Sequence, residues 1–405
     1  MSQRGAQGIV GVYLALKADA DADLLAMQMG DFYEFFADDA ETVGRELDLK
    51  VSKKSSGGES YPMAGVPVDD LTPYLRALVE RGYRVAVADQ FEVDGDIERR
   101  VTRVATPGTL LESEDADPRY LAAAVHAGDA YGVAFADVTT GRFHVTTVGD
   151  LDDVLTECYR FDPVELLPGP ELRNDDAFLS RVRDETDAVV TVGEANDFAP
   201  GAARHAVAEQ FGAEAAESLG LEEPALRASG AVLAYVEETG LAVSAAMTRL
   251  SPYLGDEQVE LDATTQRNLE LTETMSPGAE GALVDVVDHT ATSGGGRLLR
   301  DWLTRPRRDV ALLDRRQACV AALASAALSR DALQETLSTA ADLERLASRA
   351  AHGSAGPRDL ARVRETLGLL PEIVDRIEDD PRLSDSPLVD VLDAEDRERA
   401  TGLHE

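Results

Sequence analysis

The chain has 405 residues, of which 39 are basic and 76 acidic, and 44% are apolar. This length corresponds to two or three domains, and the apolar content suffices for their cores, which excludes a disordered tail. The formal charge of −37 argues against a nucleic-acid partner, because phosphates are bound by Lys and Arg. Only four cations are lysines, however, and an acidic, arginine-rich composition is typical of proteins kept soluble in high salt. The net charge therefore indicates the habitat more than the partner.

The cysteines and the apolar segments exclude several further classes of protein. Cys158 and Cys319 lie far apart and match no metal-ligand spacing, so we expect neither a zinc site nor a disulfide framework. No segment approaches the roughly 20 apolar residues of a membrane span, and residues 1–12 contain no sustained apolar run. We therefore expect a soluble, cytoplasmic protein without a membrane partner.

The first region, residues 1–112, mixes strand and helix patterns, which predicts an α/β domain. In chain order we expect a strand at 24–27, a helix at 38–47, a polar loop at 52–60, a Pro/Gly turn at 62–67, a helix at 69–81 and a strand at 83–88. A charged stretch without hydrophobic periodicity follows at 112–118 and predicts a linker.

The second region, residues 119–240, opens with alternation typical of strands. Tyr131, Val133 and Phe135 alternate with small residues, and Thr140-Gly141 predicts a hairpin turn. Asp150 is expected to cap a helix, and the short strands expected at 164–167 and 188–192 alternate with helices. A sheet with crossover helices, and hence a second α/β domain, is predicted.

The third region, residues 241–405, places its apolar residues at helical spacing, as in 298–303 and 360–370. We predict an all-α domain there. The amphipathic pattern still continues over the last residues, 388–405, which predicts that the chain is a truncated piece of a longer protein.

An unusual concentration of aromatic residues occurs at Gly30–Phe36, where four rings surround Glu34. One interpretation is that all four rings fill a core. In the other, Phe32 is presented to DNA as a wedge that enters a base step, while Glu34 accepts a hydrogen bond from a base edge. Insertion costs least at a mismatch, because such a step is already poorly stacked.

Three of the four lysines follow this cluster, at Lys50, Lys53 and Lys54. A charge cluster alone is most often a solvated loop. Beside a wedge, however, it stands where backbone phosphates require cations.

Four motifs in this region resemble, in order and spacing, the mismatch-recognition domain of the MutS family of DNA mismatch-repair proteins. They lie at 29–36 (MGDFYEFF), 61–67 (YPMAGVP), 85–90 (VAVADQ) and 103–109 (RVATPGT). Segments at 262–271, 296–303 and 342–346 are similar to the core and lever segments of the same family. The resemblance covers nearly the whole chain, and the middle region contributes little beyond its fold pattern.

The resemblance implies a multidomain fold and specific DNA contacts. Residues 1–112 would form the mixed-sheet mismatch-recognition domain, 119–240 an RNase H-like connector and 241–405 a truncated helical core and lever. Phe32 would stack on the mispaired base and Glu34 would hydrogen-bond it, with Met29 near the same step. Lys53 and Lys54, with Lys50, would lie close to the DNA backbone.

The sequence departs from the family pattern in one respect. The family carries a clamp and an ATPase, but this sequence has no G-x-x-x-x-G-K-[ST] motif, and we interpret Gly294–Gly296 as a helix entry. We therefore expect no enzyme activity and no cofactor in this chain, with ATP and Mg²⁺ bound only by the intact family protein. By the resemblance, the partners are mismatched double-stranded DNA and a MutL-type repair protein, and the intact protein is a homodimer.

Two alternatives stay open from the sequence. Asp137 ends a strand as the first metal-binding Asp of RNase H-like nucleases does, and Glu157 and Asp175 could join it. Otherwise the chain is an acidic scaffold that binds protein partners, with Phe32 in its core. The burial of Phe32 distinguishes the scaffold from DNA binding: a buried ring favours the scaffold, and an exposed ring beside lysines favours DNA. The nuclease requires Asp137 to cluster with other carboxylates.

Overall fold

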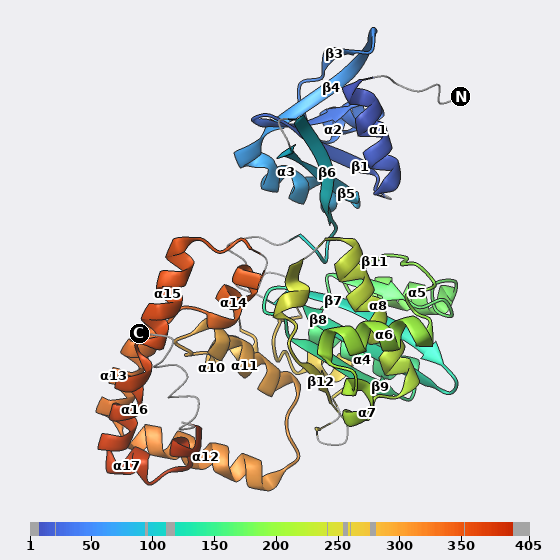
Figure 1. Cartoon of the computed structure of the whole chain (residues 1–405). Helices are drawn as coiled ribbons and strands as arrows, with labels where there is room; N and C mark the ends of the chain where they lie inside the picture. The colour runs from blue at the N-terminus through green and yellow to red at the C-terminus, as the bar shows by residue number, and fades with distance from the viewer. Residues whose placement is uncertain are drawn as a thin grey trace.

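The structure is a computed structural model that describes residues 8–391, apart from 21, 94–95, 111–117, 241, 254–257, 260, 276–280 and 352. The predicted linker at 112–118 lies, except for its last residue, outside the described residues. Figure 1 shows two sheet-containing parts followed by a frame of helices, so the chain is multidomain, with α/β parts first and a helical part after them. Within the described residues, no helix combines the length and the apolar character needed to cross a bilayer.

The first part is a six-stranded mixed sheet with helices on both faces. Its strand order is β3-β4-β2-β1-β5-β6, and β1 pairs parallel with β5. Helix α1 packs on one face with Val10 and Tyr13, whereas α2 and α3 pack on the other. The elements are α1 Ile9–Asp19, β1 Leu24–Met29, β2 Phe32–Phe36, α2 Ala37–Leu47, β3 Ser52–Ser56, β4 Glu59–Pro67, α3 Leu71–Val79, β5 Val85–Val93 and β6 Asp96–Ala105.

Two predictions for this part are wrong. The polar segment 52–60 is not a loop, because β3 and the beginning of β4 form a hairpin in which Ser52 pairs with Met63 and Ser56 with Glu59. The segment 62–67 is not a turn, because it continues β4 and pairs with β2. An edge hairpin with solvent on most sides needs few apolar residues, so its sequence resembles that of a loop.

The second part is a six-stranded sheet of order β11-β10-β7-β8-β9-β12. β8 runs antiparallel to β7 and β9, whereas β10 runs parallel to β7. Helices α4 and α5 cover one face, and α6 and α8 cover the other. The elements are β7 Tyr120–Ala127, β8 Ala130–Asp137, β9 Phe143–Val148, α4 Leu151–Phe161, β10 Glu165–Pro168, α5 Asp176–Glu185, β11 Val189–Val190, α6 Pro200–Phe211, α7 Ala215–Ser218, α8 Glu223–Glu238 and β12 Leu250–Pro252.

Local predictions for the second part are confirmed, but its extent differs. Asp150 caps α4, since its side chain accepts a 3.0 Å bond from the Asp153 backbone N–H. β12 lies beyond the predicted boundary at residue 240 and pairs with β9. The region from 241 onward is therefore not all-helical. A strand of three residues is too short to show alternation in the sequence, so only pairing reveals it.

The rest of the described chain is helical. The glycine run at 294–296 lies in the first turn of α11, and the Thr292 hydroxyl accepts a bond from the Gly295 N–H at 3.0 Å, which confirms the helix entry. Cys158 and Cys319 are free thiols in the structure. The helices are α9 Ala263–Asn268, α10 Leu283–Val287, α11 Ser293–Thr304, α12 Val310–Ser325, α13 Ala327–Ser338, α14 Leu343–Ala351, α15 Pro357–Leu367, α16 Leu370–Asp379 and α17 Pro381–Ser384.

A buried carboxylate joins the two sheet-containing parts. Glu165, the first residue of β10, is fully buried. Its oxygens accept bonds from the Thr106 hydroxyl at 2.8 Å, the Gly108 N–H at 2.7 Å, the Thr191 hydroxyl at 2.5 Å and the Tyr235 hydroxyl at 2.8 Å. Because Thr106 and Gly108 follow β6 directly, Glu165 fixes the point at which the chain leaves the first sheet.

Candidate nucleic-acid interface

Phe32 lies at a tight turn between two strands of the first sheet. Met29 pairs with Phe32, so Gly30 and Asp31 form a two-residue hairpin loop. Gly30 has φ of +66°, which glycine adopts at little cost, and glycine in the first position of such a loop is typical of a II′ turn. The turn presents Phe32 at the start of β2, with 47% of the residue exposed.

The four rings of the aromatic cluster have different environments. Phe35 and Phe36 are fully buried, and Tyr33 is 8% exposed, so the core interpretation holds for these three. Successive side chains of a strand face opposite sides of the sheet, which places Phe32, Glu34 and Phe36 on the α1 side. Phe32 does not belong to the core that packs against α1, and it remains open to solvent. The scaffold alternative, which required a buried Phe32, loses its main support.

Glu34 is held by an ion pair on the same side of the sheet. Its Oε2 lies 2.5 Å from Nζ of Lys54, and the side chains are 13% and 32% exposed, respectively. The Lys54 ammonium also lies 5.5 Å from the ring centroid of Phe36, a cation–π distance. A carboxylate compensated in this way does not present an isolated negative charge to an approaching phosphate backbone.

Arg99 is a neighbour that the sequence analysis missed. Its Nε donates to the Gln28 carbonyl at 2.9 Å and its Nη2 to Gln90 Oε1 at 3.2 Å. Burial lowers the pKa of Arg99, whereas the charge of Glu34 acts in the opposite direction. Arg99 lies in β6, a strand that the sequence analysis did not predict, so no sequence pattern pointed to this residue.

The remaining predicted DNA contacts are distributed over the hairpin. Met29 is partly buried against the α1-side core and is the register partner of Phe32. Lys53 and Lys54 are consecutive residues of β3, so they face opposite sides of the sheet, and only Lys54 shares the side of Phe32. Lys50 precedes β3 and is exposed. The structure therefore brings together Phe32, Glu34 and Lys54, but not the three lysines.

Asp137 and the other nuclease candidates have structural partners. Asp137 is fully buried and accepts bonds from the Thr139 N–H at 2.9 Å and the Thr140 hydroxyl at 2.6 Å, which organises the turn after β8. Glu157 pairs with Arg160, and Asp175 caps α5. In the part of the chain that the structure describes, no three His, Cys, Asp or Glu side chains converge as a metal ion requires. The carboxylate cluster that the nuclease alternative requires is not present there.

The family's nucleotide has no fitting cradle at the glycine run of α11. A side chain added at Gly295 would meet the Thr292 hydroxyl at 3.1 Å and Thr290 Cβ at 3.3 Å, so the chain's own threonines occupy this helix end. No lysine follows the glycines. These residues do not fit a nucleotide phosphate.

Comparison with known proteins gives three family matches in chain order. MutS domain I matches residues 7–114, MutS domain II matches 119–249 and MutS domain III matches 264–403. A relative from Haloarcula marismortui named "DNA mismatch repair protein MutS 1" is 59% identical over 407 residues, covering 98% of this chain and 44% of the relative.

Other relatives carry related names. "DNA mismatch repair protein MutS 1" from Halobacterium salinarum is 60% identical over 397 residues, covering 97% of this chain and 46% of the relative. "DNA mismatch repair protein MutS" from Thermosynechococcus vestitus is 39% identical over 378 residues, covering 88% of this chain and 43% of the relative. The chain therefore spans less than half the length of these relatives.

Proposed function

This chain belongs to the MutS family of DNA mismatch-repair proteins, and from that premise we propose that it recognises mismatched DNA through Phe32. The ring enters the weakened base step at a mispair and stacks there, and the duplex kinks around it. The observation that carries the proposal is the exposure of Phe32, at 47%, on a tight hairpin whose other aromatic side chains are buried.

Glu34 hydrogen-bonds the mispaired base in this proposal, and Lys54 compensates its charge. The ion pair orients the carboxylate on the same side of the sheet as Phe32. When a base edge approaches, Glu34 turns from Lys54 towards it, and the released ammonium becomes available to a backbone phosphate. Met29 lies next to the same step, whereas Lys50 and Lys53 contact the backbone only if the duplex also reaches the edge or the opposite side of the hairpin.

The second part of the chain acts as the family's connector in this proposal, with an RNase H-like fold. Its support is the strand order: numbered along the chain from β7 to β11, the sheet reads 3-2-1-4-5, with the second strand antiparallel. The connector and the helical part relay the recognition event, within a homodimer and towards a MutL-type protein in the cytoplasm. ATP and Mg²⁺ would be bound by family regions other than the described residues.

The proposal is tested by binding of the chain to a duplex with one G·T mismatch and to its matched twin, across a series of KCl concentrations. We expect about a tenfold preference for the mismatch, equivalent to about 1.4 kcal/mol. Phe32→Ala should abolish the preference. The matched control is Phe91→Ala, which removes another exposed phenylalanine of the same sheet, 41% exposed, and should keep it.

Two results would contradict the proposal. One is equal binding of both duplexes by the folded wild-type chain. The other is a mismatch preference that survives Phe32→Ala. Circular dichroism of both variants excludes unfolding as the cause of any loss.

A further inference from the structure

A cavity of about 670 Å³ lies between the second sheet and the first long helices of the helical part. Strands β9 and β12 contribute one wall, and α11, α12 and the segment between them contribute the other. The volume is in the range of small-molecule sites. The side chains that define its chemistry are Tyr253, Gln258, Trp302, Arg305, Arg307 and Arg316.

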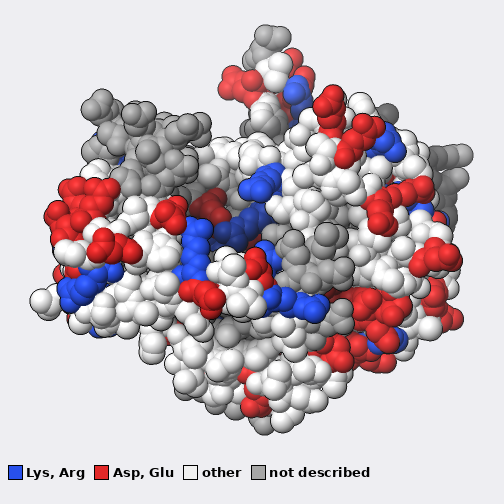
Figure 2. Space-filling view, turned by 90° about the horizontal axis from the view of Figure 1, so that it is seen from below, with Lys and Arg blue, Asp and Glu red and all other residues white. Residues whose placement is uncertain are grey.

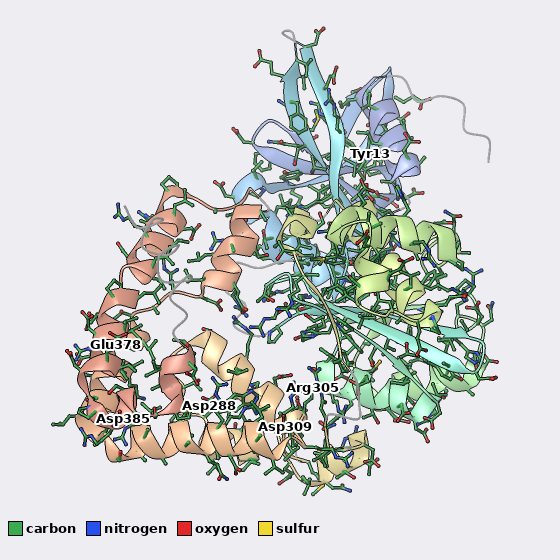
Figure 3. All side chains as sticks on the ribbon, turned by 60° about the horizontal axis from the view of Figure 1, so that its bottom comes forward. Tyr13, Asp288, Arg305, Asp309, Glu378 and Asp385 are labelled. Carbon is green, nitrogen blue, oxygen red and sulfur yellow. The ribbon has the colours of Figure 1, made fainter. Side chains whose placement is uncertain are left out.

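The cavity is rich in arginine although the chain is strongly acidic. Among the described lining residues, three are arginines and two are carboxylates, Asp301 and Glu222. Asp301 is engaged by Arg305, whose Nη1 lies 2.7 Å from Oδ1. On the face seen in Figure 2, Lys and Arg side chains gather around a hollow, while Asp and Glu predominate towards the rim. Figure 3 labels Arg305 near the point where α11 leads towards α12.

Arg316 and Arg307 repel each other within this lining. The guanidinium of Arg316 lies 3.6 Å from the ring centroid of Trp302. Burial lowers the pKa of Arg316, the charge of Arg307 lowers it further, and Asp301 opposes both. An anion between two like charges in a partly desolvated site would be attracted by both.

Two buried polar atoms of the lining residues have no hydrogen-bond partner among the described residues. They are Nε of Arg305, a donor, and Oε1 of Gln258, an acceptor. Gln258 is 6% exposed, so bulk water does not readily satisfy it. Buried donors and acceptors without partners are unfavourable. A ligand that offers both an acceptor and a donor would satisfy them.

We infer that this cavity binds a small phosphate-bearing anion, whose oxygens face the guanidinium groups of Arg307 and Arg316. Planar guanidinium forks match tetrahedral oxyanions better than they match a spherical ion such as chloride. Free hydrogenphosphate and a mononucleotide share this chemistry. Trp302, which is 37% exposed, offers an aromatic surface that only a nucleotide would use. Because the walls come from two parts of the chain, the anion would also strengthen their packing.

Trp302 provides the measurement, because it is the single tryptophan of the chain. Its fluorescence is followed in molar KCl at constant potassium concentration while inorganic phosphate, adenosine monophosphate or adenosine is added. We expect a saturable change with both phosphates, none with adenosine, and a rise in Tm that saturates over the same concentrations. Tighter binding of the nucleotide by tenfold or more would identify a nucleotide as the ligand, and equal binding would identify the oxyanion alone.

Variants test the assignment through ³¹P NMR line broadening, which does not depend on Trp302. Arg316→Gln and Arg307→Gln should each weaken binding at least tenfold. Arg45→Gln makes the same change of charge on α2 of the first part and should bind as wild type. The inference is overturned if neither phosphate gives a saturable signal with the wild-type chain, or if both cavity variants that fold bind as the wild type does.

Discussion

Glu34 and Glu165 are the same residue type in two contrasting environments. Glu34 lies in β2, between β1 and β4 of the first sheet, with a side chain that is 13% exposed and Lys54 as its ionic partner. Glu165 lies at the junction of the two sheets, fully buried, and accepts bonds from four different residues. Burial and the charge of Glu165 raise the pKa of Tyr235, which keeps that hydroxyl protonated as a donor.

The difference indicates which carboxylate is free to act. A carboxylate saturated by four donors cannot exchange them for a ligand without leaving buried donors unpaired. A carboxylate paired with one partly exposed lysine can exchange that single partner for another without leaving several buried donors unpaired. Glu165 is therefore a structural residue at the junction of the two sheets, whereas Glu34 is the carboxylate that can change its partner.

The largest expected effect is that of Glu165→Ala. Removal of the carboxylate leaves the Thr106, Gly108, Thr191 and Tyr235 donors unpaired in the interior, so the free energy of unfolding should fall by about 3 kcal/mol or more. Urea denaturation in molar KCl measures it. Glu34→Ala is the matched control and should cost about 1 kcal/mol or less. Similar losses in the two variants would remove the distinction drawn between these residues.

An intermediate effect is expected for His144, a second polar group in the interior of the second part. Burial, followed by the charges of Arg305 and Arg142, lowers the pKa of His144 to about 3. In the unfolded chain an ordinary histidine has a pKa of about 6.5, so below that pH the unfolded state binds the proton first. This contribution to stability is complete above about pH 6.5 and is lost as the pH falls towards 3.

The measurement is the free energy of unfolding between pH 4 and 8, for the wild type and His144→Gln. The wild type should lose up to about 1.4 kcal/mol per pH unit more than the variant. His205→Gln, which removes a solvent-exposed histidine, is the control and should follow the wild-type curve. Parallel curves for the wild type and His144→Gln would show that His144 ionises freely in the folded protein.

The smallest effect on stability is expected at Lys54, where the consequence appears in DNA binding. Lys54→Met should change the free energy of unfolding by about 1 kcal/mol or less. It should also weaken binding to the mismatched duplex more than binding to the matched one, because Glu34 releases the ammonium only at a mispair, and it should reduce the salt slope for the mismatched duplex by about one. Lys53→Met, on the other side of the strand, is the control. If Lys53→Met weakens binding as much as Lys54→Met, the duplex contacts both sides of the hairpin.

The sequence predicted those features that depend on neighbouring residues. Asp150 stands one residue before an amphipathic run, and a cap of this kind forms within one turn of helix, so the prediction held. The alternation around Phe135 likewise predicted a strand that the structure contains. The polar hairpin at 52–60 was missed, because an exposed edge strand and a loop have the same composition.

The candidate site was predicted only in part, because sequence adjacency does not show which face of a sheet a side chain takes or which distant strand lies beside it. Its motif located Phe32 and Glu34, but adjacency in sequence suggested a lysine cluster that the strand divides between two faces. Arg99 joins Glu34 from a strand more than sixty residues away, which no local pattern could show.

The sequence by itself determined the family of the chain, the positions of several of its helices and those strands whose residues alternate or form a local apolar run, because these depend on local spacing and on motif order. Only the tertiary structure decided which of four adjacent rings is exposed, which lysine lies beside Glu34, and that Glu165 joins the two sheets. The exposure of a side chain and the identity of its bonding partners depend on pairing and packing between segments that are distant in the chain. The residues next to it in the sequence therefore do not determine either property.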